Sequence, residues 1–123
     1  SEQETATSTS TAVSPGRQQF HPSAAKMWAY VTVSGGTPSL DASYNVNSIT
    51  DTSAGNVTIT IGTDFSTANY CAVANAVSAA GAAHTASVKT GHAAGSLVVR
   101  TYLSSTGADT DNINLSVVAF GDQ

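Results

Sequence analysis

Apolar and polar residues alternate along most of the chain from Lys26 onward, which is the pattern of strands that bury one face. In residues 29–33 an alanine and two valines fall on one face, and Tyr30 and Thr32 fall on the other. In residues 57–62 apolar side chains alternate with threonines in the same way. Both segments are therefore predicted to be β-strands with one face in a core.

Short strands at near-regular spacing are expected throughout this part of the chain. Their predicted ranges are 29–33, 42–50, 57–62, 70–77, 84–90, 96–103 and 113–120. Residues 34–41 (SGGTPSLD) are predicted to be a loop, because two glycines and a proline interrupt the alternation. The pattern predicts an all-β fold: an antiparallel β-sandwich with a jelly-roll-like arrangement.

One segment also suits a helix. Residues 71–84 (CAVANAVSAAGAAH) are rich in alanine, the best helix former, and are long enough for about three turns. The β-branched Val73 and Val77 and the interruption at Gly81 favour a strand followed by a loop.

Two of the expected strands are apolar on both faces. The second face holds Val98 and Tyr102 in one strand, and Val118 and Phe120 in the other. A sandwich strand has only one core face, so the second face needs another cover. Association between copies of the chain would supply it, and a longer loop folded over the sheet is the alternative.

The composition bears on the partners of the domain. The chain of 123 residues is 41% hydrophobic and only 10% charged, with a net charge of −4. Its few cationic residues, Arg17, Lys26, Lys89 and Arg100, are scattered, which argues against nucleic acid and against a polybasic membrane contact. Insertion into a membrane is not expected, because no apolar run approaches the roughly 20 residues of a spanning helix.

The chemically reactive side chains form no recognisable site. Cys71 is the single cysteine and is predicted to be a small buried hydrophobe in a strand. His21, His84 and His92 lack the spacing of metal ligands, so no metal and no cofactor are expected. Copies of His21 meeting at a symmetry axis are the one arrangement that would give a metal site.

Catalysis is not expected either. There is no nucleophile-elbow motif, and glutamate occurs only near the start of the chain. Asp109 and Asp111 resemble a calcium loop only faintly, and a solvated turn explains them more simply. The chain is therefore predicted not to be an enzyme. Because it lacks an initiator methionine and the features of a signal peptide, it is expected to be a piece of a longer protein.

Three stretches taken together point to a family. They are residues 11–28 (TAVSPGRQQFHPSAAKMW), 43–73 (SYNVNSITDTSAGNVTITIGTDFSTANYCAV) and 117–123 (VVAFGDQ). In this order they resemble the C-terminal domain of bacteriophage and prophage tail-fibre-like proteins, from about Ala12 to Gln123. The resemblance is weakest in residues 78–95.

The resemblance implies a homotrimeric β-domain in the virion, at the end of a tail fibre or similar appendage, where it contacts the host surface. Residues 1–14 would then be the end of the fibre shaft or a linker, 15–25 a collar, and 26–123 the β-sandwich tip. The collar residues would meet near the trimer axis. They are Arg17, Gln18, Gln19, Phe20 and His21.

Strand parity then suggests which loops face the host. If the shaft joins near Lys26, alternating strand directions put residues 34–41, 63–69 and 91–95 at the far end, together with the C-terminus. The receptor-binding candidates on these loops suit a saccharide, with Phe65 as a platform and its neighbours as hydrogen-bonding groups. They are Thr37, Asp64, Phe65, Asn69 and His92. The alternative for Phe65 is that it caps the end of the core.

Three functions are compatible with this sequence. The favoured one is a non-enzymatic receptor-binding domain that recognises a cell-surface saccharide or protein on the host. The alternative is a structural trimerisation or decoration domain of a virion fibre, without a host ligand. A depolymerase is the third.

Overall fold

A computed structural model describes residues 18, 21, 23–78, 83–111 and 113–123. In this part of the chain, eight strands form two four-stranded sheets, and all strand pairs are antiparallel. The strands are β1 (Met27–Ser34), β2 (Thr37–Tyr44), β3 (Val46–Ser53), β4 (Asn56–Ile61), β5 (Cys71–Val77), β6 (His84–Val88), β7 (Ser96–Leu103) and β8 (Asn114–Phe120).

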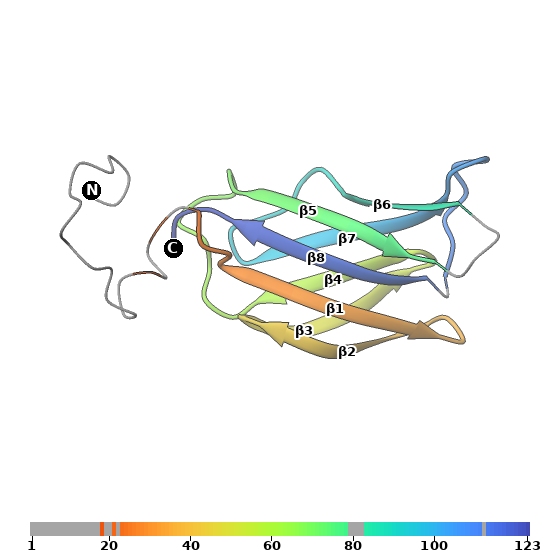
Figure 1. Ribbon diagram of the computed structural model, residues 1–123, viewed down its shortest axis with the longest axis horizontal. Coiled ribbons are helices and arrows are strands. Elements are labelled where there is room, and N and C mark those ends of the chain that lie inside the picture. The colour runs from red at the N-terminus through yellow and green to blue at the C-terminus, as the bar shows by residue number, and fades with distance from the viewer. Residues whose placement is uncertain (1–17, 19–20, 22, 79–82, 112) are drawn as a thin grey trace.

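The two sheets face each other as the layers of a sandwich (Figure 1). Sheet A has the strand order β2-β1-β8-β5, and sheet B has the order β3-β4-β7-β6. The predicted all-β antiparallel sandwich is confirmed. The structure also confirms that the segment with helical character begins with a strand, because β5 pairs with β8 along its full length. None of the described residues belongs to a helix long and apolar enough to cross a membrane.

The core consists of the side chains that point inward from both sheets. The predicted alternation in residues 57–62 is confirmed, since Ile59 is fully buried while Thr58 and Thr60 are half-buried on the outer side. The largest fully buried side chains are Met27, Ile59, Ile61, Leu97, Leu115, Val31 and Val99. Burial of their apolar surface is the main favourable contribution to the free energy of folding.

The structure corrects the predicted loop at residues 34–41. Gly35 and Gly36 have φ angles of 58° and 81°, which make a tight hairpin turn between β1 and β2. Pro38 follows within β2, at a place where it breaks no ladder, because β2 is the edge strand of sheet A.

The predicted single strand over residues 42–50 is also wrong. Asn45 has a φ of 57°, and this left-handed residue separates β2 from β3. Its amide group replaces the interrupted ladder: Nδ2 donates to the carbonyl oxygens of Lys26 (2.9 Å) and Thr63 (3.1 Å), and Oδ1 accepts from the Thr63 N–H (2.6 Å). Asparagine tolerates this conformation better than most residues, so one residue turns the chain from one sheet to the other.

The extra strand reverses the predicted polarity of the later loops. β1 begins and β8 ends at the same end of the sandwich, which we name the terminal pole (Figure 1). Residues 62–70 lie there, as shown by the hydrogen bond from Ser66 N–H to Asp122 O (2.7 Å), and residues 89–95 lie beside them, since Phe65 N–H donates to Ala94 O (3.0 Å). The opposite end, the distal pole, carries the Gly35–Gly36 turn, residues 54–55 and residues 104–111.

Candidate functional site

The structure does not bring the five predicted receptor-binding residues together. Thr37 follows the Gly35–Gly36 turn at the distal pole. The other candidates belong to segments at the terminal pole, contrary to the predicted polarity. They are Asp64, Phe65, Asn69 and His92. The reason is the strand β2, which the sequence pattern did not reveal.

Phe65 fills the end of the core and offers no exposed platform. Its side chain is only 3% exposed, and its ring stacks on Tyr70 with centroids 4.1 Å apart. His92 contacts the Tyr70 ring edge-to-face at 4.9 Å. The Tyr70 hydroxyl donates to Ser96 O at 3.1 Å, and burial raises the pKa of this phenol. These contacts close the sandwich at the terminal pole.

The predicted collar lies mostly outside the described residues, where Arg17, Gln19 and Phe20 fall. Of the remaining two residues, Gln18 accepts a backbone hydrogen bond from His21 N–H at 3.1 Å. The His21 ring pairs with its neighbour, since Nδ1 lies 2.6 Å from Ser23 Oγ.

A network of polar groups joins two loops to the end of β7 at the distal pole. Asp111 Oδ1 accepts a hydrogen bond from Gly55 N–H at 2.5 Å, across 56 positions of sequence. Asp109 accepts from Arg100 Nε (2.5 Å) and from Asn56 Nδ2 (3.2 Å). The hydrogen bond from Arg100 holds the pKa of the Asp109 carboxyl below its ordinary value of 3.8. Sequence reasoning treated the two aspartates as a solvated turn and missed these long-range partners.

Close packing accompanies this network. A β-carbon on Gly55, which has a φ of 68°, would lie 2.5 Å from Thr101 O and 2.8 Å from Thr110 N. Thr101 is itself buried, and its hydroxyl donates to Thr110 O at 2.9 Å. Asn56 is 4% exposed, and its Oδ1 has no hydrogen-bond partner among the residues that the structure describes. The loop 104–111 is therefore held in place by the turn that precedes β4.

This loop exposes several residues that carry hydroxyl groups. Ser104, Ser105 and Thr106 are exposed, and Thr37, which is also exposed, follows the Gly35–Gly36 turn at the same pole. Searched over the described residues, the structure contains no group of three His, Cys, Asp or Glu side chains able to hold a metal ion. Hydroxyls both donate and accept hydrogen bonds, and an ionised carboxylate accepts them, which is the chemistry that recognises other polyhydroxylated molecules.

A second surface of interest is the outer face of sheet A, which is apolar. One cross-strand row runs over the whole sheet, because Trp28 lies opposite both Tyr44 and Val118, and Val118 lies opposite Val73. Trp28 is 41% exposed, Tyr44 48%, Val73 56% and the nearby Val77 41%. All the exposed large hydrophobic side chains of the described chain belong to this one face.

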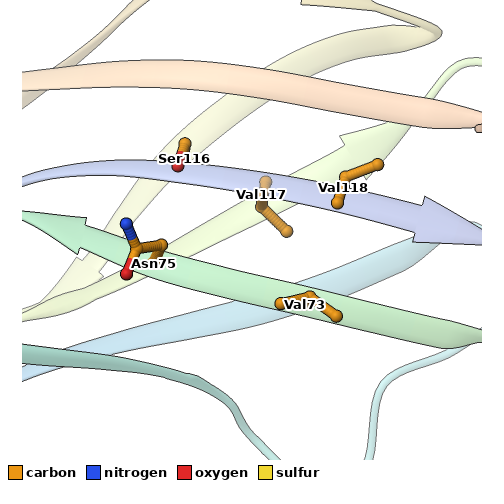
Figure 2. Close-up of a pocket in the computed structure, with 5 residues that line it drawn as sticks. All are labelled: Val73, Asn75, Ser116, Val117 and Val118. Carbon is orange, nitrogen blue, oxygen red and sulfur yellow. The ribbon is translucent and has the colours of Figure 1, made fainter.

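A depression on this face lies between β5 and β8 (Figure 2). Val73 and Asn75 line it from β5, and Ser116 and Val118 line it from β8. Figure 2 shows Val117 at its floor, turned away from the others toward the sandwich interior. The predicted second apolar face of the last strand is thus present and uncovered by any described segment. On β7 the outward Tyr102 instead carries the Arg100 guanidinium over its ring, 4.7 Å from the centroid.

Cys71 also lies on this face, and the prediction that it is buried is wrong. The thiol is exposed, because the inward positions of β5 are taken by its alanines. Ala74 lies opposite Val117 and Ala76 opposite Leu115, both inward-facing core residues. The small alanines suit positions where β5 lies close to β6 at the sandwich edge.

The chain matches no protein-family profile, no curated protein and no solved structure.

Proposed function

We propose that this domain is a non-enzymatic receptor-binding tip of a phage tail-fibre-like protein, and that it binds the host through its distal pole. One observation carries the proposal: β1 begins and β8 ends at the terminal pole. Any chain that continues from either end of the sandwich leaves from there. The distal pole is then the end that points away from the attachment, where an adhesion surface has access to a cell.

The chemistry of the distal pole supports a saccharide as ligand. Loop 104–111 carries exposed serine and threonine residues and the carboxylate of Asp109, and Thr37 adds another hydroxyl at the same pole. The hydrogen bonds of Asp109 and Asp111 fix the loop before a ligand arrives, which lowers the entropy cost of binding. This surface replaces Phe65 and its neighbours as the proposed contact, because those residues lie at the pole where the chain attaches.

The remaining parts of the proposal follow from the family resemblance. The domain would be a homotrimer in the virion, joined to an upstream shaft through the collar. A second candidate function is a structural trimerisation or decoration domain without a host ligand. The exposed apolar face of sheet A favours this candidate, since it offers a surface for other copies of the chain or virion proteins.

A pair of matched substitutions tests the distal pole. Ser105→Arg places a bulky cation on the exposed distal loop, and Ser66→Arg places the same group on an exposed loop at the terminal pole. The probe is an array of bacterial lipopolysaccharides and capsular polysaccharides, overlaid with the fluorescently labelled chain. We expect the wild type to bind a subset of spots, Ser105→Arg to lose at least tenfold in affinity, and Ser66→Arg to bind as the wild type does.

Three results would go against the proposal. Loss of binding in Ser66→Arg alone would move the contact to the terminal pole. A wild-type chain that binds no spot and no cell of a broad bacterial panel would favour the structural domain. Release of reducing sugar from a bound polysaccharide would indicate a depolymerase.

A further inference from the structure

We propose that the outer face of sheet A is the surface through which copies of this chain pack against one another. This inference deepens the oligomer part of the proposed function and rests on it: the copies must associate. It does not depend on host binding. Four features of this face support it: a continuous apolar row, the absence of charge on three strands, polar groups that can pair with their own copies, and a sufficient area.

The apolar row is continuous. Directly opposite residues on neighbouring strands have their β-carbons about 4.5–5.5 Å apart, so Tyr44, Trp28, Val118 and Val73 lie next to one another across the four strands. Isolated exposed hydrophobic side chains are ordinary on a protein surface. A connected row that crosses a whole sheet is not, and it marks a place where another surface removes it from water.

The face carries no charge over three of its four strands. On β1, β8 and β5, every residue of which is described, the outward positions hold no Asp, Glu, Lys, Arg or His. The charged residue Asp41, paired with Thr32 Oγ1 at 3.0 Å, lies toward the β2 edge. Two copies of a chain with net charge −4 repel each other. A contact through an uncharged face avoids placing like charges next to each other at short distance.

The polar groups of this face can pair with their own copies. Next to the apolar row, Tyr30, Ser116 and Asn75 form a second row, because Tyr30 lies opposite Ser116 and Ser116 opposite Asn75. Hydroxyl and amide groups each both donate and accept hydrogen bonds. A second copy of the same row can therefore satisfy them, with no need for a partner of opposite charge.

The area is sufficient for a specific contact. Four strands about 4.8 Å apart and seven residues long at about 3.4 Å per residue span roughly 450 Å² in flat projection. Before side-chain relief is added, burial of this face on every copy removes roughly 900 Å² from water in a pair and roughly 1,400 Å² in the proposed trimer, and a specific interface buries at least about 1,000 Å². Residues 1–17 contain few apolar side chains, so this segment is a poorer match to the row than a second copy.

The chain supplies two reporters on this face. Trp28 is the single tryptophan and Cys71 the single cysteine. Both point outward from sheet A, since Trp28 is 41% exposed and the Cys71 thiol is exposed. Tryptophan fluorescence and thiol reactivity therefore monitor this surface and no other part of the molecule.

The experiment combines mass and fluorescence for three proteins over a range of concentrations. Val73→Asp introduces a carboxylate at the most exposed position of the apolar row, and Ser48→Asp introduces one at an exposed position of β3 in sheet B. For the wild type we expect an oligomer by sedimentation velocity. On dilution into the range where the oligomer dissociates, the Trp28 emission should shift to the red and Cys71 should react faster with a maleimide. Val73→Asp should raise the dissociation constant of the oligomer roughly a hundredfold or more, because a carboxylate would be buried in the interface without a partner. Ser48→Asp should leave it unchanged.

The outcomes separate this inference from the rest of the proposed function. A wild type that is monomeric at all concentrations, with constant Trp28 emission, would overturn the association itself. An oligomer whose mass Val73→Asp does not change, or that Ser48→Asp weakens equally, would overturn the choice of face. If Val73→Asp fails to fold, Val73→Ser tests the choice of face instead, with an expected loss in association affinity of roughly fivefold. Loss of polysaccharide binding with an unchanged oligomer would refute the receptor function and leave this inference intact.

Discussion

The substitution Gly55→Ala tests the packing of the distal pole most sharply. Gly55 has a φ of 68°, and a left-handed conformation costs a residue with a β-carbon roughly 1–2 kcal/mol. The added carbon would also lie 2.5 Å from Thr101 O and 2.8 Å from Thr110 N. Both are backbone atoms, so a side-chain rotation cannot relieve the overlap.

Relief of the overlap would break hydrogen bonds. The turn must move away from β7, which lengthens the bonds from Thr101 N–H to Gly55 O (2.7 Å) and from Gly55 N–H to Asp111 Oδ1 (2.5 Å). Each contributes about 1 kcal/mol, so with the conformational cost the free energy of unfolding should fall by about 3–4 kcal/mol. That is a large part of the 5–15 kcal/mol typical of a domain.

Gly35→Ala is the matched control. Gly35 has a similar φ of 58°, but a β-carbon there would meet no atom within 4 Å. This variant should lose only the cost of the left-handed conformation, about 1–2 kcal/mol. The assay is urea denaturation followed by circular dichroism at one fixed protein concentration, because association makes stability depend on concentration. Equal losses in the two variants would refute the described packing of Gly55 against β7.

Three further predictions follow from single residues. Ile59→Ala, in a fully buried position, should lower the free energy of unfolding by about 2–5 kcal/mol in urea denaturation, and a loss below 1 kcal/mol would place Ile59 outside the core. Asn45→Ala loses the hydrogen bonds of the amide and the tolerance for a φ of 57°, so the free energy of unfolding should fall by about 2–4 kcal/mol. Asn45→Gly keeps the left-handed turn and should lose less stability. A lower melting temperature for Asn45→Gly than for Asn45→Ala would contradict this role. Arg100 lowers the pKa of Asp109, so its stabilisation is fully present above the ordinary value of 3.8 and is lost as the pH falls through the lower folded value. The difference in melting temperature between wild type and Arg100→Gln should therefore shrink as the pH falls from 6 through the lowered pKa of Asp109. A difference that does not change with pH would show that the pair has no effect through ionisation.

The sandwich was predictable because its signal is periodic. Two-residue alternation in β4 and in β1 fixes which side chains point inward, and the structure confirms these faces. The boundary between β2 and β3 was not predictable in the same way. Asn45 interrupts a run that reads as one strand, and the Gly35–Gly36 hairpin resembles an open loop until the partner strand is known.

This local error had a global consequence for the site. Each strand reverses the direction of the chain, so one missed strand exchanges the two poles for every later loop. Phe65 was thereby assigned to a host-facing loop, although its ring closes the core beside Tyr70 at the terminal pole. Periodicity in the sequence indicates which side chains of a strand point inward. It does not indicate at which end of the sandwich a given loop lies.

The prediction that Cys71 is buried failed for a different physical reason. In β5 both faces are apolar, because alanines occupy one and valines the other, so alternation alone does not tell which of them points inward. The structure puts the alanines inside because the space between β5 and β6 is narrow, and so the larger valines and the thiol face outward. The apolar surface expected on the last strand thus extends over all of sheet A.

The mass of the wild-type chain in solution tests this account most directly. The apolar face of sheet A predicts stable association, and sedimentation velocity at micromolar concentration should give a whole-number multiple of 12.4 kDa, with three copies for the proposed fibre tip. A species of 12.4 kDa that persists at the highest soluble concentration, with Trp28 emission typical of a water-exposed indole, would contradict it.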